Sequence, residues 1–150
     1  MKTVLTALLA ICVCLVIGCG EKTMDFESLK ALAEKEDAKA QTNLGLMYET
    51  GEGVEKDDKE AVKWYRKAAE QGEHAAQFNL GQMYRNGIGV PKDIVTAYTW
   101  HNIAAANGNE SGKHLKDTIT KKMTAEQITK ADELFKEMIK KNPKLILDEE

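Results

Sequence analysis

Apolar residues in the middle of the chain recur at helical spacing, in two successive stretches. The first stretch places them at i, i+4, i+7 and i+8: Ala40, Leu44, Met47 and Tyr48. The second places them at i, i+3, i+7 and i+8: Ala61, Trp64, Ala68 and Ala69. Each set shares one face of an α-helix. Glycines at 51 and 53 separate the stretches, and Asp57 is a typical N-cap for the second. The pattern predicts a helix–turn–helix unit, which Gly72 closes.

This unit occurs twice without a gap. Residues 38–73 and 74–109 are identical at 17 of their 36 aligned positions. In the first copy these positions are Ala40, Gln41, Asn43, Leu44, Gly45, Met47, Tyr48, Gly51, Gly53, Val54, Lys56, Asp57, Ala61, Trp64, Ala68, Ala69 and Gly72. A period of this length is typical of solenoids, whose units bury their apolar faces by stacking. Gly45 and Gly81 fall inside helices, where glycine costs about 1 kcal/mol relative to alanine, so we expect another element to approach them closely.

The segments flanking the two repeats look like partial units. Residues 25–37 align with the second helix of a unit, and residues 110–142 contain two further helices that cap the stack. The last helix carries an apolar stripe: Ile128, Ala131, Leu134, Phe135, Met138 and Ile139. Thr124 and Gln127 have the spacing of a capping box at its start. Residues 143–150 form the tail, of which we expect Lys144–Glu150 to be frayed or loosely docked.

The first 18 residues read as a targeting signal. Lys2 precedes an apolar run that is too short to span a bilayer, which takes roughly 20 residues, but suits a signal peptide. The run ends in Val16-Ile17-Gly18-Cys19, which resembles a bacterial lipobox. That resemblance implies cleavage before Cys19, lipidation of Cys19 and a linker over 19–24. It places the protein in the cell envelope. By the same resemblance, Gly20, which stands where a retention Asp would be, favours the outer membrane, with the protein facing the periplasm. A signal peptide cut elsewhere and an uncleaved short anchor are the alternatives.

Charge and cysteine content narrow the function classes. The formal net charge is -3, with acidic and basic residues interleaved, so no basic face for nucleic acid is expected. The three cysteines all lie within the first 19 residues. The repeats therefore carry neither a disulfide framework nor a cysteine-ligated metal.

Candidate catalytic and metal-binding residues are sparse. The histidines are His74, His101 and His114, and none has a second histidine or a cysteine at metal spacing. We expect all three to be at the surface or half-buried. Ser28 and Ser111 lie in no nucleophile motif. The sequence thus predicts no catalytic residue, no metal and no cofactor.

The repeat pattern A-x-x-N-L-G-x-M-Y-x-x-G-x-G-V-x-K-D-x-x-x-A-x-x-W-x-x-x-A-A-x-x-G resembles the Sel-one-like repeat (SLR) family, a relative of the tetratricopeptide repeat. The resemblance implies an all-α fold, a right-handed α-solenoid of helix–turn–helix repeats with a C-terminal capping helix. It also implies a scaffold or adaptor that holds a protein or cell-wall-associated partner. An accessory subunit of a peptidoglycan-processing or secretion complex is the first alternative. A hydrolase of the cysteine-rich SLR type is the second, but that branch depends on disulfide-linked repeats. The oligomeric state is left open.

Helix geometry defines a candidate partner-binding surface. At about 100° per residue, the flank of the apolar face holds Lys39, Asn43, Leu46 and Thr50 in the first repeat. In the second repeat the same flank holds Asn79, Gln82 and Asn86. First helices line the concave groove in tetratricopeptide-like solenoids, so this flank should face a partner. The recurring Asn43 and Asn79 either bind an extended peptide backbone or make structural bonds between neighbouring helices.

Overall fold

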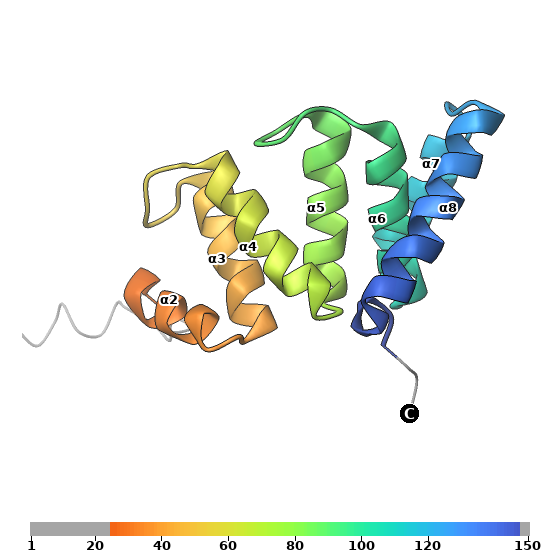
Figure 1. Cartoon of the computed structure of the whole chain (residues 1–150). Coiled ribbons are helices and arrows are strands. Elements are labelled where there is room, and N and C mark those ends of the chain that lie inside the picture. The colour runs from red at the N-terminus through yellow and green to blue at the C-terminus, as the bar shows by residue number, and fades with distance from the viewer. Residues whose placement is uncertain (1–24, 148–150) are drawn as a thin grey trace, which may run out of the picture.

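The computed structural model describes residues 25–147, and all of their regular structure is helical (Figure 1). The elements in chain order are α2 (Phe26–Glu34), α3 (Ala38–Thr50), α4 (Asp58–Glu70), α5 (His74–Asn86), α6 (Ile94–Ala106), α7 (Glu110–Thr120), α8 (Ala125–Lys141) and the 3-10 helix η1 (Pro143–Leu145). No strand occurs in this range, and the predicted all-α repeat class is confirmed. The signal segment, Cys19 and the linker lie outside the described residues.

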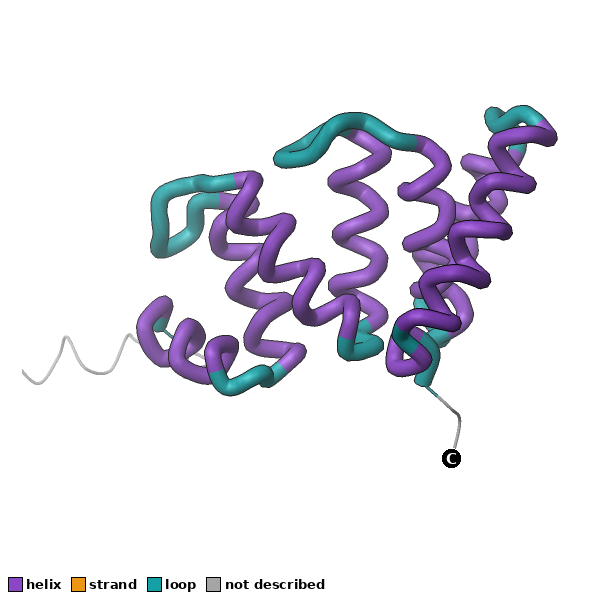
Figure 2. Tube along the Cα trace, viewed as in Figure 1, coloured by secondary structure: helices purple, strands orange, loops and turns teal. Residues whose placement is uncertain are grey.

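The helix ends follow from the expected capping chemistry. Asp57 and Asp93 cap α4 and α6, each accepting from the backbone N–H groups two and three residues ahead. Gly51 and Gly87 end α3 and α5 with φ of 77° and 71°, a left-handed conformation that favours glycine. The two longer turns that follow these glycines lie at the same end of the stack (Figure 2). The capping box at Thr124 is also present.

Consecutive helices from α2 to α7 pack pairwise in chain order, which makes the stack a solenoid (Figure 1). Leu44 and Leu80 are fully buried at equivalent positions of α3 and α5. The two tryptophans differ in their surroundings. Trp100 is buried in the main core, whereas Trp64 is half-buried beside the N-terminal cluster, with Lys67 Nζ 4.4 Å from the centre of its ring.

The helix-interior glycines mark close approach of an aromatic ring, as expected. A Cβ at Gly45 would lie 2.7 Å from the ring of Tyr65, and one at Gly81 would lie 2.6 Å from the ring of His101. Tyr65 and His101 occupy the same position of α4 and α6. Each ring therefore lies directly against the backbone of the preceding first helix.

Buried glutamines join the successive helix pairs. Gln41 Nε2 donates to the Ala33 carbonyl at 3.0 Å, and Gln77 Nε2 donates to the Ala69 carbonyl at 3.1 Å. Each glutamine oxygen in turn accepts from an amide 30 residues ahead, that of Gln71 or Asn107, at 2.8 Å. These residues bond each first helix to the second helices before and after it.

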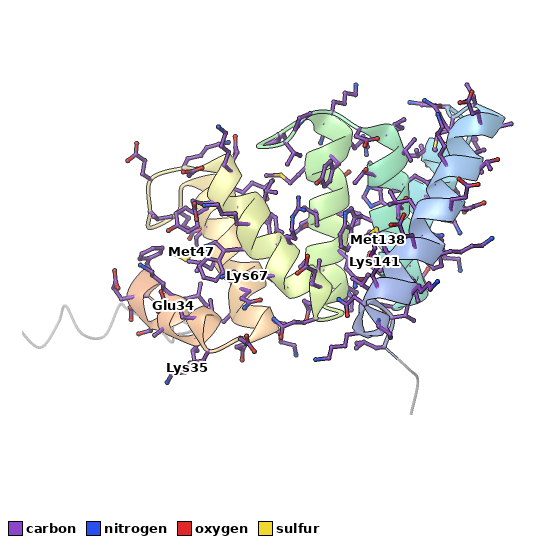
Figure 3. All side chains as sticks on the ribbon, in the orientation of Figure 1. Glu34, Lys35, Met47, Lys67, Met138 and Lys141 are labelled. Atoms are coloured by element: carbon purple, nitrogen blue, oxygen red, sulfur yellow. The ribbon has the colours of Figure 1, made fainter. Side chains whose placement is uncertain are left out.

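The last helix, α8, packs along α6. Ala131 is its buried centre, and Phe135, Met138 and Ile139 pack against the main core. Figure 3 shows Met138 on the side of α8 turned toward the stack. The apolar stripe predicted from the sequence is therefore the packed face of α8.

The expectation of a loosely docked tail is wrong as far as residue 147. Leu145 is 2% exposed, and its carbonyl accepts from Asn107 Nδ2 at 2.6 Å and from Gln77 Nε2 at 2.9 Å. The Leu147 N–H donates to Asn107 Oδ1 at 2.8 Å. Buried amide donors need acceptors, and the tail backbone supplies one to both. Residues 148–150 lie outside the described range.

Candidate binding surface

The four candidate residues of the first repeat lie exposed along one side of α3. Lys39, Asn43, Leu46 and Thr50 follow one another at i, i+4, i+7 and i+11, and all four are exposed. Leu46 is 47% exposed in the interior of the helix. We call these four residues the α3 edge. Within residues 25–147 no first helix precedes α3, whereas α5 follows α3 and its equivalent residues Asn79 and Gln82 are half-buried.

The second-repeat candidates are in a different situation. Asn79 and Gln82 are half-buried on α5, and Gln82 Oε1 accepts from Arg85 at 3.1 Å. Asn86 is exposed and lines a cavity between α5 and α7. The seven residues therefore fall into three settings: an exposed edge, an intramolecular contact and a cavity wall.

Asn79 lies next to a polar cluster around the Tyr65 hydroxyl, which suggests a structural role for this asparagine. The Tyr65 hydroxyl donates to Glu49 Oε2 at 2.6 Å, and the Asn79 side chain also interacts with this hydroxyl. Burial raises the pKa of Tyr65, the bond to Glu49 adds to the rise, and Asn79 opposes it. Glu49 comes from α3, Tyr65 from α4 and Asn79 from α5, so the cluster spans three helices. This geometry favours the structural interpretation of Asn79.

The corresponding cluster is absent from the second repeat, where Glu49 and Tyr65 are replaced by Arg85 and His101. His101 is fully buried, and neither ring nitrogen has a hydrogen-bond partner among the described residues. Burial lowers the pKa of His101 to about 4, and the charge of Arg85 acts in the same direction. The expectation of a surface or half-buried histidine is thus wrong for His101, because its register in α6 is that of the buried Tyr65.

The two other histidines are as expected. His74 and His114 are exposed, and the ring of His74 lies 3.2 Å from Asn109 Nδ2. Ser28 donates its hydroxyl to the capping residue Asp25 at 2.9 Å, which is a helix-capping contact. Across residues 25–147, no three His, Cys, Asp or Glu side chains gather closely enough to hold a metal ion.

Three groups of residues were not predicted from the sequence. They are the glutamine pair Gln41 and Gln77, the Tyr65 cluster, and the cationic lining of the cavity beside Asn86. The repeat alignment contained a signal for the last two, because positions 49/85 and 65/101 change together between the copies. No helix in the described range is long and apolar enough to cross a membrane.

Comparisons with known proteins agree on the repeat. The model of the Sel1 repeat family matches residues 38–73 and 74–109. A protective antigen of uropathogenic Escherichia coli that displays an SLR fold is 39% identical over 80% of this chain, with a TM-score of 0.75. The match covers 26% of the antigen, so the chain spans about a quarter of its length.

A second solved structure is similar over most of its length. A Sel1 repeat protein from Oxalobacter formigenes is 43% identical, with a TM-score of 0.60, over 61% of this chain and 69% of that protein. A search of curated proteins found no match.

Proposed function

Because the chain belongs to the Sel1 repeat family, we propose that it is a lipid-anchored scaffold of the bacterial cell envelope, which binds a protein partner through the α3 edge. Solenoids of this kind present extended surfaces on rigid helices, and protein binding is their general use. The proposed role is to hold a partner, with no reaction of its own.

The exposure of Leu46 is the observation that carries this proposal. On α5 the corresponding side of the helix is partly buried. Gln82, the counterpart of Leu46, is half-buried on α5. A helix of a partner could cover the α3 edge, with Leu46 buried at the centre and Lys39, Asn43 and Thr50 at the polar rim. Because α3 is already folded, this contact needs little ordering of the scaffold.

The proposed anchor follows from the lipobox-like end of the signal segment. Cleavage before Cys19 and its acylation would add several buried hydrocarbon chains, enough for stable membrane attachment. Only a few residues separate Cys19 from Phe26, the first residue of α2. The partner should therefore be met close to the membrane surface, and we place it on the periplasmic side of the outer membrane.

Replacing the exposed leucine tests the partner surface. The full lipidated chain is used to capture partners from native envelopes, as wild type, Leu46→Glu and Leu32→Glu. Leu32 is the matched control, since it is an exposed leucine (37%) on α2. We expect the wild type and Leu32→Glu to capture the same proteins and Leu46→Glu to lose them. Equal capture by both variants would remove the α3 edge from the proposal.

The anchor has its own test. Mass spectrometry of the mature N-terminus should find acyl chains on Cys19, and Cys19→Ser should release the protein from the membrane fraction. A mature chain with an unmodified Cys19 contradicts the anchor and leaves the partner surface untouched.

A further inference from the structure

A cavity of about 310 Å³ lies between the C-terminal ends of α5 and α7, under the turn that leads into α6. Three cationic side chains line it: Arg85 from α5, Lys92 from the turn and Lys122 from the turn after α7. Leu115 and Ile119 form part of an apolar wall, and Asn86 adds an amide. The cavity therefore combines concentrated positive charge with an apolar surface.

The three cations have no carboxylate partner within residues 25–147. The ion pairs of this range join Lys56 to Asp58, Lys63 to Glu60, Lys130 to Glu126 and Lys141 to Glu137. Asp93 is next to Lys92 in the chain, but its carboxylate caps α6 through the N–H groups of Val95 and Thr96. The C-terminal ends of α5 and α7 contribute a partial negative charge of about 0.5 each, which the three cations outweigh. The cavity is thus locally positive in a chain whose formal net charge is -3.

The first repeat shows that the fold does not require this charge. The counterparts of Arg85 and Lys92 there are Glu49 and Lys56, and Lys56 pairs with Asp58 at 3.4 Å. One period before Lys122 the chain has Asn86, which is uncharged. Tyr65 reaches Glu49 in that copy. In the second copy Arg85 stands at the position of Glu49, and the shorter His101 at that of Tyr65. The positive cavity is therefore particular to the second repeat.

We propose that this cavity binds a phosphate monoester with a short apolar substituent. Such a group carries a charge of about -1.5 to -2 at neutral pH, which three cations can balance, whereas a single carboxylate would leave two cations uncompensated. The Arg85 guanidinium offers paired donors that suit phosphate oxygens, and the two lysines add charge from the other walls. The substituent lies on Leu115 and Ile119. This site is separate from the α3 edge and needs no protein partner.

The test is calorimetric titration of the full lipidated chain in detergent with butyl phosphate, inorganic phosphate and butyrate. We expect saturable one-to-one binding of butyl phosphate, weaker binding of inorganic phosphate and weakest binding of butyrate. Arg85→Gln and Lys122→Gln should each weaken butyl phosphate binding about tenfold or more. Arg66→Gln is the matched control, because Arg66 bonds Tyr84 and is absent from the cavity wall. It should leave the affinity unchanged.

Three results would overturn the proposal: no saturable binding of butyl phosphate, equal binding by Arg85→Gln and wild type, or butyrate binding as tightly as butyl phosphate. Circular dichroism of each variant verifies that it is folded. A further arm identifies the natural source of the group. If the natural ligand is a lipid monoester, phosphatidate in nanodiscs should compete with butyl phosphate. If it is a soluble monoester, phosphatidate should leave the affinity for butyl phosphate unchanged. Both of these outcomes require the site.

Discussion

Tyr65 and Glu49 form a 2.6 Å hydrogen bond between α4 and α3, and neither residue of this pair recurs in the second repeat. The hydroxyl is buried, so loss of the bond leaves a carboxylate oxygen with fewer donors. The two repeats thus place different side chains at the same positions between their helices.

Removing the Tyr65 hydroxyl should destabilise the fold. Tyr65→Phe keeps the ring against Gly45 and deletes the bond to Glu49, which we expect to lower the free energy of unfolding by about 1 kcal/mol. Urea unfolding followed by circular dichroism measures the change. Tyr48→Phe is the control and should change stability by less than about 0.5 kcal/mol, because its hydroxyl makes no hydrogen bond to another residue of the range 25–147. Equal effects of the two substitutions would contradict this interpretation.

His101 should make the fold sensitive to mild acid. Its pKa is about 4 in the folded chain against an ordinary value of 6.5. Above pH 6.5 the imidazole is neutral in both states and contributes no pH dependence. As the pH falls from 6.5 to 4, the unfolded chain binds a proton that the folded chain does not, so stability decreases by up to about 3 kcal/mol.

Replacement of His101 isolates this contribution. His101→Phe removes the titrating group and two unpaired nitrogens, and the ring of Tyr65 shows that a six-membered ring fits the same position. The difference in unfolding free energy between variant and wild type should grow as the pH falls through this window. Parallel pH profiles would show that His101 does not titrate as described.

A methyl group at either helix-interior glycine should be harmful. Gly45→Ala and Gly81→Ala would place a Cβ at 2.7 and 2.6 Å from a buried ring. Alanine favours the helix by about 1 kcal/mol, yet overpacking costs about 1–3 kcal/mol, and we expect net destabilisation of both variants. Gly112→Ala should be milder, since its nearest atoms lie at 3.1 Å. Thermal unfolding ranks the three, and a stabilised Gly81→Ala would contradict the close approach.

The two repeated asparagines should respond differently to substitution. Asn79 is half-buried and opposes the raised pKa of the neighbouring Tyr65 hydroxyl, so Asn79→Ala should cost about 1 kcal/mol of stability. Asn43 is exposed, and Asn43→Ala should stay within about 0.5 kcal/mol of the wild type. Chemical unfolding of the two variants checks this, and equal losses would show that the asparagines share one structural role.

Docking of the tail depends on Asn107. Its side chain bonds both the Leu145 carbonyl and the Leu147 N–H, so Asn107→Ala should free the last residues and expose Leu145. We expect a loss of about 1–3 kcal/mol and faster proteolysis after Lys144. Gln71→Ala removes the corresponding amide of the first repeat, which bonds Gln41 but not the tail, and should not speed cleavage there.

The sequence was sufficient for features that depend on neighbours in the chain. Helical spacing located α3 to α6, glycine and aspartate marked their ends, and the apolar stripe identified α8. The periodicity also indicated that Gly45 and Gly81 face a close contact. Each of these inferences needs only local chemistry and the 36-residue period.

Features that depend on distant partners could not be read from one sequence. The alignment showed that Gln41 and Gln77 are the same residue at equivalent positions. Each of them donates to a backbone carbonyl, however, and any residue can supply that acceptor, so the sequence does not identify it. Leu145 bonds residues 38 and 68 positions away, so its burial had no local sign. The paired change of Glu49 to Arg85 and Tyr65 to His101 was present in the alignment, but only the structure shows that each pair shares a site.

The docked tail makes the two ends of the solenoid unequal in their ability to accept another repeat. At its C-terminal end, the Leu145 carbonyl accepts from the side-chain amides of Gln77 and Asn107. A repeat inserted after Asn109 would move Leu145 away from these two amides. At the other end, a repeat inserted before Ala38 would meet the side of α3 that is now uncovered, and the tail contacts would be undisturbed. A longer protein built on this plan should therefore carry its additional repeats on the N-terminal side of α3.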